Sequence, residues 1–519
     1  MTAMAMRRRL GARELLEHML DAGTFVSWDS PVRGVVGLSA APGYAADLEA
    51  AAEKSGSDES VLTGEGRIRN HRVAVVVSDF AFLAGSIGRD AARRLVAAVE
   101  RATQLGLPLV AMPASGGTRM QEGTSAFLAM VEIVAAVQAH RNAGLPYLVY
   151  LRHPTTGGVM ASWGSLGHVT AAEPGALLGF LGPRVYEALH GEAFPPGVQT
   201  AENLFDHGHV DAVVPPEGLS DYFARVLDLL LAPSSGSSSA AVAGLGQAAG
   251  LGQAAAPETQ QTGAWDAVQL SRDPLRPSTE ELLRDGAGDV VLLRGAGDGA
   301  KENGMLVALA RFGNTSCVVV GHQRHGASGK SMGPASLRDA RRGIRLAKDL
   351  RLPLVTVIDT PGAALSKEAE EGGLAAEIAR ALYDLLGLGT PTLSVLLGQG
   401  TGGGALALLP ADRTLAARNA WLAPLPPEGA SAIVHRTTSH APALAESQGI
   451  TAAGLAGRGV VDVVLEERPD AAQEPVDFCR RMGEVIGVEL QALAGSGALA
   501  GSGFPRLQAR RARYRALVS

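Results

Sequence analysis

The sequence predicts an α/β fold that occurs twice along one chain. Three observations support this prediction: short apolar segments alternate with longer amphipathic ones, similar motifs recur at a nearly constant distance, and a low-complexity segment separates the two sets. Alternating strands and helices are typical of folds in which helices cover both faces of a sheet. A length of 519 residues fits more than one domain.

The expected elements follow the same order in both halves. In the first half, strands are expected at 73–78, 109–114 and 147–151, with helices at 90–105 and 124–140. In the second half, strands are expected at 317–321, 354–359 and 392–397, with helices at 337–350 and 373–386. Short apolar runs suit buried strands, whereas longer runs with helical periodicity suit amphipathic helices.

Motifs of the first half return in the second half about 245 residues later. Leu107 corresponds to Leu352 at a distance of 245 residues, and we match the glycine pair at 157–158 to the pair at 403–404, at a distance of 246. Repeated matches at nearly one distance favour a duplicated fold over chance similarity.

One segment divides the chain. Residues 233–263 are mostly Ser, Gly, Ala and Gln and offer little to bury, so we expect a flexible linker there. The expected domains are therefore an N-terminal domain at 1–232 and a C-terminal domain at 264–519. A basic helix is expected near the end of the second domain, at 506–515.

Composition argues against several classes of protein. A net charge of −6 and a pI near 6.1 give no reason to expect nucleic acid or an anionic membrane as partner. The two cysteines, Cys317 and Cys479, lie far apart and provide neither a disulfide framework nor a structural zinc site. The first twenty residues are amphipathic and include acidic residues, unlike a secretion signal. We therefore expect a cytoplasmic protein without a bound metal.

In each half, two expected strands end in glycine-rich turns that lead into helices. Glycine lets the main chain approach a ligand closely, and the first N–H groups of a helix are unpaired. Two such turns facing each other could hold the oxyanion of a thioester enolate or of a cyclic urea. Packing alone would also account for them, so both interpretations stay open. The turns contain Gly116, Gly117, Gly157 and Gly158 in the first half and Gly362, Ala363, Gly403 and Gly404 in the second.

Motifs for several other chemistries are missing from the sequence. There is no nucleotide-binding P-loop, no Gly-x-Ser-x-Gly turn and no His-Glu-x-x-His zinc motif. The closest histidines, His207 with His209 and His322 with His325, are expected to be exposed or hydrogen-bonded rather than metal ligands.

Long ordered motifs in both halves match one enzyme family. In the first half, the motifs that resemble the beta subunit of the acetyl-CoA carboxylase carboxyltransferase lie at 114–123, 154–158, 171–180, 182–185, 196–202 and 207–211. In the second half, the motifs similar to the alpha subunit of the same enzyme lie at 321–323, 358–363, 373–380, 398–407, 427–433 and 511–514. The chain thus resembles a beta and an alpha subunit fused together.

This resemblance implies an α/β fold of two crotonase-like domains in tandem, of the ββα superhelix type. It implies that a carboxyl group moves from carboxybiotin, supplied on a partner carrier protein, to acetyl-CoA or another short acyl-CoA. A biotin carboxylase and a biotin carboxyl carrier protein would be the partners. In that family the active site forms where the beta half of one protomer meets the alpha half of another, so at least a homodimer is expected.

The resemblance also assigns roles to residues. Gly157 and Gly158 would form one oxyanion hole, and Gly403 and Gly404 would form the other. The turns at Gly116-Gly117 and Gly362-Ala363 would help to line the substrate pockets. Arg119 is a candidate for binding the CoA phosphates, although a structural ion pair with Glu122 is an equally open alternative. No acid or base side chain is required, because biotin released as its anion could take the substrate proton.

The sequence departs from the family pattern at several points. It lacks the four-cysteine zinc ribbon that usually opens the beta subunit, and Gln399 and Gly402 replace a frequent Glu and Ser. Two other functions therefore stay open: a malonyl-thioester decarboxylase that works without biotin, and an inactive scaffold subunit.

Overall fold

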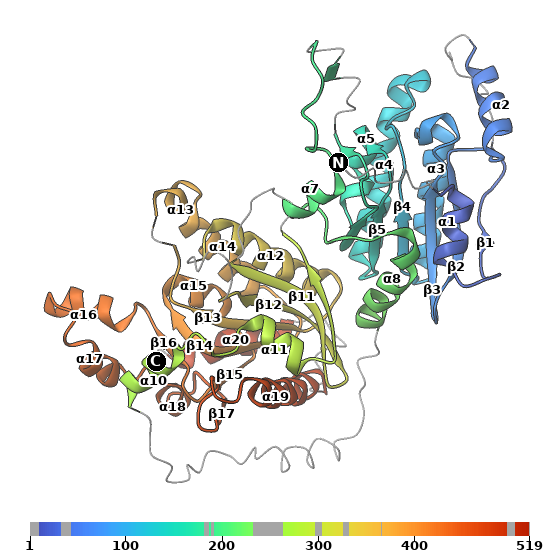
Figure 1. The fold of residues 1–519 in the computed structure, drawn as a ribbon. Helices are drawn as coiled ribbons and strands as arrows, with labels where there is room; N and C mark the ends of the chain where they lie inside the picture. Colours follow the sequence, from blue (N-terminus) through green and yellow to red (C-terminus); the bar gives the residue numbers. More distant parts are fainter. Residues whose placement is uncertain are drawn as a thin grey trace. The chain divides into compact units, whose positions relative to one another are not determined.

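The computed structural model describes residues 10–32, 43–180, 186–187, 191–231, 263–295, 304–324, 332–364, 366–495 and 504–517 (Figure 1). The chain forms two compact units that divide between Asp228 and Leu229, here called the N-terminal and C-terminal units. Apart from Gly263, the expected linker at 233–263 lies outside the described residues, so its flexibility and the domain limits stay predictions.

A seven-stranded sheet forms the centre of the N-terminal unit, in the order β1-β2-β3-β4-β5-β7-β9. The first three strands are antiparallel neighbours, whereas β3 to β9 run parallel. Two short strands, β6 and β8, pair separately in parallel. The strands are β1 (Val26–Ser27), β2 (Val61–Ile68), β3 (His71–Ser78), β4 (Leu109–Met112), β5 (Tyr147–Leu151), β6 (Thr155–Thr156), β7 (Val169–Ala172), β8 (Leu178–Gly179) and β9 (Ala212–Val213).

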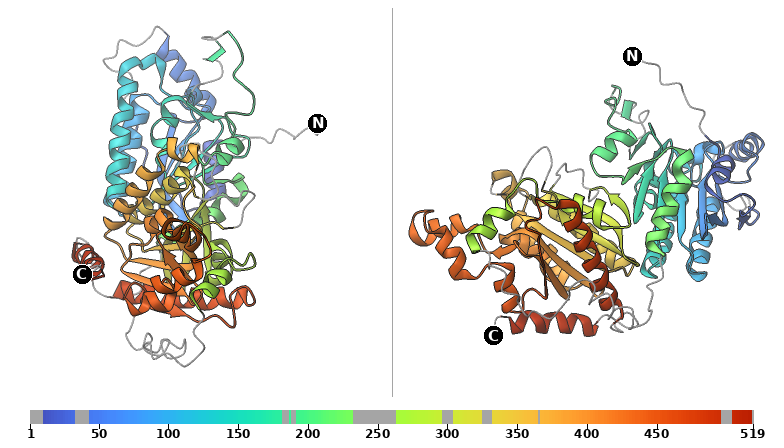
Figure 2. Two further views of the ribbon diagram at one scale, coloured as in Figure 1. Left: turned by 90° about the vertical axis from the view of Figure 1, so that its left-hand side faces the viewer. Right: turned by 60° about the horizontal axis from the view of Figure 1, so that its bottom comes forward.

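Helices cover both faces of this sheet. Helix α3 (Arg89–Gln104) buries Ala91, Leu95 and Ala98, which fall on one helical face, and packs with α4 (Gly123–Asn142) against one side of the strands. Figures 1 and 2 show α8 (Pro216–Leu230) on the other side. The remaining helices are α1 (Ala12–Met19), α2 (Tyr44–Ser55), α5 (Gly157–Met160), α7 (Ala201–Asp206) and the 3₁₀ turns η1 (Leu83–Gly85), η2 (Met120–Glu122) and η3 (Trp163–Ser165).

The C-terminal unit repeats this sheet topology. Its main sheet has the order β10-β11-β12-β13-β14-β15-β17, with antiparallel pairing up to β12 and parallel pairing beyond it. Strand β16 pairs in parallel with the far end of β14, as β8 does with β6. The strands are β10 (Asp289–Leu293), β11 (Met305–Phe312), β12 (Thr315–His322), β13 (Leu354–Thr360), β14 (Thr392–Thr401), β15 (Arg413–Ala417), β16 (Trp421–Ala423) and β17 (Val463–Leu465).

The helices of the C-terminal unit also form two layers. Helices α12 (Pro334–Asp349) and α14 (Leu374–Leu386) pack against each other, and so do α11 (Thr279–Gly286) and α19 (Pro475–Gly495). The others are α10 (Ala264–Ser271), α13 (Lys367–Glu371), α15 (Gly402–Leu408), α16 (Pro427–His435), α17 (Ala441–Gln448), α18 (Ala452–Gly457) and the predicted basic helix α20 (Phe504–Ala516).

All eleven elements expected from the sequence are present, and the α/β prediction is confirmed. The duplication is also visible in the hydrogen bonding: the isolated parallel bridge between Ile87 and Thr118 recurs between Met332 and Ala363, 245 residues later. The two halves are therefore related residue by residue where their glycine turns lie.

This relationship corrects one detail of the sequence analysis. Helix α5 begins at Gly157 after the N-cap Thr156, and α15 begins at Gly402 after the N-cap Thr401, again 245 residues later. The structural counterpart of the pair at 157–158 is thus the pair at 402–403, and the expected match to 403–404 is wrong by one residue. The third glycine of the second motif lies within α15, so the run of glycines shifted the match.

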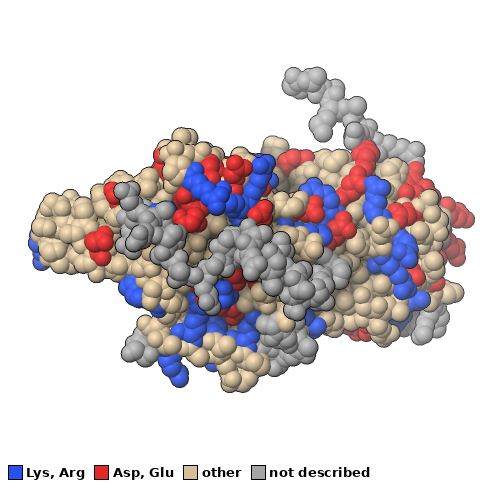
Figure 3. Space-filling model, turned by 90° about the horizontal axis from the view of Figure 1, so that it is seen from below, with Lys and Arg blue, Asp and Glu red and all other residues tan. Residues whose placement is uncertain are grey.

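The surface gives two further observations. On the face drawn in Figure 3, Lys and Arg side chains are intermixed with Asp and Glu.

One described helical segment, Met120–Asn142, is long and apolar enough to cross a membrane by length and composition. It buries Ala126, Ile133 and Val137 in the core of the N-terminal unit, and one such helix is weak evidence for a membrane span.

Candidate functional site

In the N-terminal unit, the turn after β4 touches the start of α5. A Cβ atom on Gly117 would lie 3.4 Å from the main-chain nitrogen of Gly158, and a Cβ atom on Gly157 would lie 3.3 Å from the Cα of Gly117. Gly117 and Gly157 also have positive φ angles of 112° and 61°. The backbone conformation and the close approach both require glycine at these two positions.

Most N–H groups of these turns are engaged within the unit. Three of the predicted site residues donate as follows: Gly116 to the carbonyl of Ala84 at 2.9 Å, Gly117 to Ser115 Oγ at 3.0 Å, and Gly157 to the carbonyl of Phe180 at 2.9 Å. These three N–H groups hold the turns in shape, and a ligand would have to compete with their present acceptors.

Two N–H groups remain for a ligand. Those of Thr118 and Gly158 have no acceptor among the described residues, and both residues are partly exposed. A Cβ atom on Gly158 would lie 2.9 Å from Thr118 Oγ1, so the two residues are immediate neighbours. Thr118 was not predicted from the sequence. It could have been found because it lies 245 residues before Ala363, which was among the predicted residues.

The C-terminal unit repeats the arrangement. The N–H of Gly362 donates to Thr360 Oγ1 at 3.1 Å, and the φ angle of Gly362 is 130°. The residues that correspond to Thr118 and Gly158 are Ala363 and Gly403, whose N–H groups likewise have no acceptor within the described ranges and which are partly exposed. The same pair of free N–H groups therefore occurs in each unit.

Gly404, predicted as a site residue, has a different environment. It is buried, as is its counterpart Val159, whereas Gly403 is partly exposed. A Cβ atom on Gly404 would lie 2.9 Å from the Cε of Met332, inside the unit. The geometry therefore favours Gly403 over Gly404 as the donor to a ligand.

Arg119 is 1% exposed and is occupied by protein groups. Its guanidinium donates to both carboxylate oxygens of Glu59, at 2.9 and 2.5 Å, and lies 3.6 Å from Glu122. Burial lowers the pKa of this guanidinium, but the hydrogen bonds and the charge of Glu59 raise it more. The structural alternative for Arg119 is thus favoured over binding of a CoA phosphate.

In the C-terminal unit, polar groups lie close together at the ends of β13 and β14. Asp359, 3% exposed, accepts a hydrogen bond from the main-chain N–H of Gln399 at 2.9 Å and lies 3.4 Å from Arg324 Nη1. Burial raises the pKa of the Asp359 carboxyl. Gln399 Oε1 in turn lies 3.4 Å from Nε of Arg272, which pairs with Glu428.

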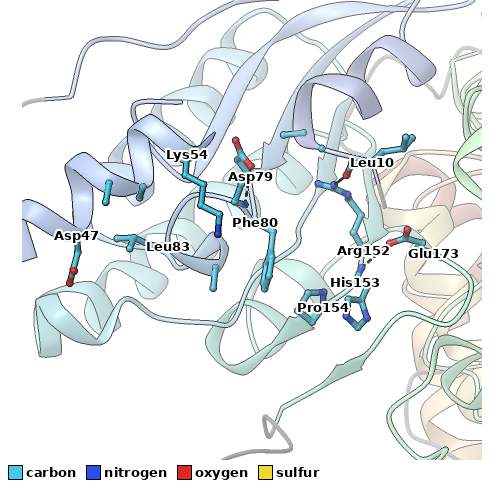
Figure 4. Close-up of a pocket in the computed structure, with 16 residues that line it drawn as sticks. Leu10, Asp47, Lys54, Asp79, Phe80, Leu83, Arg152, His153, Pro154 and Glu173 are labelled. Carbon is cyan, nitrogen blue, oxygen red and sulfur yellow. Dashed lines mark hydrogen bonds between the residues drawn. The ribbon is translucent and has the colours of Figure 1, made fainter. Parts of the chain in front are cut away.

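A cavity of about 730 Å³ lies next to the first pair of turns in the N-terminal unit (Figure 4). Ala84, whose carbonyl accepts the N–H of Gly116, and Pro154, whose carbonyl accepts the N–H of Ser115, both line it. Figure 4 shows Lys54 and Phe80 on its wall together with Arg152, His153 and Glu173. Its volume is typical of sites for small molecules and cofactors.

Within the part of the chain that the structure describes, no group of three or more His, Cys, Asp or Glu side chains is placed to hold a metal ion. Cys317 and Cys479 are both free and buried. His207 is hydrogen-bonded, as expected, through Nδ1 to the carbonyl of Asn203 at 2.8 Å. His322 is buried and is hydrogen-bonded, as expected, with Nδ1 3.2 Å from the carbonyl oxygen of Val357, and burial lowers its pKa to about 4.

Comparisons with known proteins found matches over most of the chain. A family model described as "Carboxyl transferase domain" matches residues 9–475. The chain is 55% identical over 491 residues to the "Probable biotin-dependent acyl-coenzyme A carboxylase beta3 subunit" of Mycobacterium tuberculosis (strain ATCC 25618 / H37Rv), covering 93% of this chain and 95% of that protein. It is 38% identical over 476 residues to the "Acetyl-coenzyme A carboxylase carboxyl transferase subunits beta/alpha" of Salinispora arenicola (strain CNS-205), covering 89% and 83%.

Solved structures show the same fold. A transcarboxylase 12S crystal structure, described as a hexamer assembly with methylmalonyl-coenzyme A bound, superposes with a TM-score of 0.72 at 21% identity, over 94% of this chain and 90% of that one. A single-chain, multi-domain long-chain acyl-CoA carboxylase superposes with a TM-score of 0.67 at 19% identity, over 90% of this chain and 46% of that one.

Proposed function

Because this chain belongs to the carboxyl transferase family and is an acyl-CoA carboxyltransferase with a crotonase-like fold, we propose that it moves a carboxyl group from carboxybiotin to acetyl-CoA or another short acyl-CoA. The observation that carries this proposal is the repeated pair of free N–H groups, one pair in each unit. The reaction has two reactants that each develop negative charge on an oxygen.

The chemistry requires two oxyanions to be stabilised in turn. Loss of the carboxyl group as CO₂ breaks the N–C bond of carboxybiotin and leaves negative charge on the ureido group. That group takes a proton from the α-carbon of the thioester, and the resulting enolate forms a C–C bond to CO₂. The pair Thr118 and Gly158 would stabilise the oxygen of one reactant, and the pair Ala363 and Gly403 the oxygen of the other. Loss of one such donor costs about 10²- to 10³-fold in rate.

The cavity beside the first turns supports a route for the CoA arm. It adjoins the segments of Ala84 and Pro154, which are hydrogen-bonded to the turn that leads to Thr118. A thioester held at Thr118 and Gly158 would extend its pantetheine chain toward this space. Lys54 provides an ammonium group on the wall.

Partners and location are further parts of the proposal. A biotin carboxylase and a biotin carboxyl carrier protein would supply carboxybiotin; in support, one relative is named as a subunit of a biotin-dependent acyl-coenzyme A carboxylase. The exposed apolar side chains of Phe127, Leu128 and Val131 on α4 support burial in a homo-oligomer. We place the protein in the cytoplasm, since both cysteines are free thiols.

The test uses the purified full chain and the reverse direction of the reaction. Malonyl-CoA is incubated with and without biocytin, a soluble biotin analogue that accepts the carboxyl group in this direction, and the loss of malonyl-CoA is followed by chromatography. Loss that requires biocytin is the expected result. Loss that proceeds equally without biocytin would instead identify a decarboxylase, and no loss of malonyl-CoA or methylmalonyl-CoA under either condition would favour the scaffold function.

A further inference from the structure

Arg119 directly follows Thr118, one of the two residues with a free N–H in the N-terminal unit. Its main-chain N–H donates to the carbonyl of Ile87 at 3.0 Å, and the N–H of Ile87 donates to the carbonyl of Gly117 at 2.9 Å. Its side chain returns to the same segment, since Nη2 donates to the carbonyl of Ser86 at 2.8 Å. The main chain and the side chain of Arg119 thus hold residues 86–87, here called the strip, against the turn 117–119.

The strip is also held from behind. Ser60 Oγ donates to the carbonyl of Ser86 at 2.8 Å, and Arg119 Nη2 donates to Ser60 Oγ at 3.2 Å. The adjacent Glu59, 2% exposed, receives both guanidinium hydrogen bonds described above. These hydrogen bonds, here called the clamp, therefore join three segments that are far apart in sequence: 59–60, 86–87 and 117–119.

A second carboxylate closes the cluster. Glu122 Oε1 accepts a hydrogen bond from the hydroxyl of Tyr44 at 2.5 Å, and its Oε2 accepts one from the N–H of Arg89, the first residue of α3, at 2.7 Å. Burial and the bond to Glu122 raise the pKa of Tyr44, which keeps this hydroxyl a donor. Glu122 therefore stays paired even without the guanidinium.

The C-terminal unit shows that the fold does not need this arginine. The residue that corresponds to Arg119 is Ala364, whose N–H donates to the carbonyl of Met332 at 2.9 Å in the same way. Buried ion pairs cost desolvation energy and are often no more stabilising than apolar side chains of similar volume. Among the described residues, only the turn of the N-terminal unit has such a buried cluster, which therefore calls for a reason other than stability.

We propose that Arg119 is a positioning residue that fixes the direction of the Thr118 N–H by clamping the strip 86–87 to the turn. The inference rests on the proposed function, in which Thr118 donates to a reactant's oxygen. Replacement of Arg119 alone would leave Glu59 buried without its partner and so unfold the region. The informative variant is E59M/R119M, which replaces both charges by apolar side chains.

The E59M/R119M variant is expected to fold with a lower melting temperature than the wild type, because the buried N–H of Ser60, which donates to Glu59 Oε1 at 2.6 Å, loses this acceptor. Its kcat for biocytin-dependent loss of malonyl-CoA is expected to fall by at least about 10-fold, with KM changed little, because a displaced donor weakens the transition state more than substrate binding. Hydrogen exchange measured on peptides covering 112–122 is expected to become faster. This second measurement does not depend on activity.

Arg510→Met is the matched control. Arg510 is equally buried, at 1% exposure, and binds the carbonyls of Leu385 and Leu388 and the side chain of Thr392, at the opposite end of β14 from the glycine turn. It also pairs with Asp412, which keeps a second partner, Arg506, when Arg510 is replaced. Its loss should lower the melting temperature and leave kcat of the folded protein unchanged.

Three outcomes would overturn the positioning role. They are wild-type kcat in folded E59M/R119M, unchanged exchange at 112–122, and an equal loss of kcat in Arg510→Met. An inactive wild type would instead contradict the proposed function, and the exchange measurement would still decide whether the clamp holds the turn.

Discussion

Asp359 accepts a hydrogen bond from the main-chain N–H of Gln399 at 2.9 Å, across the place where β13 and β14 change register. The register changes between Ile358 and Thr360, because β14 inserts extra residues there. A Cβ atom on Gly398, within the insertion, would lie 2.5 Å from the Asp359 carboxylate. The carboxylate thus fills the space that the glycine leaves and holds the bulge that leads to α15.

Asp359→Ala is expected to damage this bulge. The variant leaves the N–H of Gln399 buried without an acceptor, which costs about 1–3 kcal/mol of stability, and leaves the charge of Arg324 without its neighbour. The kcat should fall because the free N–H of Gly403 follows the bulge along the chain. Steady-state kinetics and thermal melts check this. Asp359→Asn, which keeps an acceptor, should be milder, and a wild-type kcat in Asp359→Ala would refute the link.

The choice between Gly403 and Gly404 can be tested by removing one N–H group. Gly403→Pro deletes the proposed donor at a position in the first turn of α15 and should lower kcat by about 10²- to 10³-fold. Gly403→Ala, whose Cβ would likewise lie 2.8 Å from Ile378 Cδ1 but which keeps the N–H, is the control for the steric effect and should lower kcat much less. Gly404→Ala keeps every N–H. Its Cβ would lie 2.9 Å from the flexible Cε of Met332 and, at ordinary contact distance, 3.5 Å from the main-chain nitrogen of Ala363, so activity should stay within a few-fold of wild type. If Gly404→Ala lowered kcat more than Gly403→Pro did, the expected match of 157–158 to 403–404, at a distance of 246 residues, would be correct after all.

Gly117→Ala tests the contact between the two turns of the N-terminal unit. At a φ of 112° the new side chain strains the backbone by roughly 1–3 kcal/mol, and its Cβ would lie 3.4 Å from the nitrogen of Gly158. We expect a lower melting temperature together with a large loss of kcat.

Gly106→Ala provides the control for that strain. Gly106 also has a positive φ, of 65°, but a Cβ there would meet nothing within 4 Å. This variant should lose stability and keep its kcat. If both variants lose kcat to the same degree, strain rather than the crowded turn is responsible.

Local patterns predicted the elements and the glycine turns because each depends on neighbours in sequence. The alternating segments gave all ten helices and strands that were expected from the alternation, and the glycine pairs mark turns whose backbone requires glycine, as at Gly117 and Gly157. The antiparallel strands β2 and β11 were not among the expected elements. Strand pairing depends on residues that lie far apart in sequence or on a turn whose signal is weak.

The charged residues could not be assigned in this way. Arg119 lies in a sequence that suits a phosphate-binding arginine, but its partner Glu59 is 60 residues away and reaches it only through the fold. The same holds for Asp359 and Gln399, 40 residues apart. Thr118 has no distinguishing side chain for this role, because only its main-chain N–H is involved.

Two buried histidines make stability depend on pH. His140 is fully buried, with Nδ1 3.0 Å from Thr103 Oγ1 and Nε2 3.2 Å from the carbonyl of Pro146, and burial lowers its pKa to about 4. Burial lowers the pKa of His322 to about 4 as well. An unfolded histidine titrates near a pKa of about 6.5, so below that pH the unfolded chain binds protons that the folded chain does not. Stability from these groups is therefore complete above about pH 6.5 and is lost as the pH falls toward 4.

The midpoint of urea unfolding should thus decrease between pH 7.5 and pH 5. Each histidine contributes at most about 3 kcal/mol over the whole interval, and less by pH 5, where only part of the interval has been crossed. His140→Gln, which can still donate to the carbonyl of Pro146, should be less stable at pH 7.5 but should show a smaller decrease on acidification. An unchanged slope in His140→Gln would show that other groups, chiefly carboxylates in ion pairs, set the acid limit of stability.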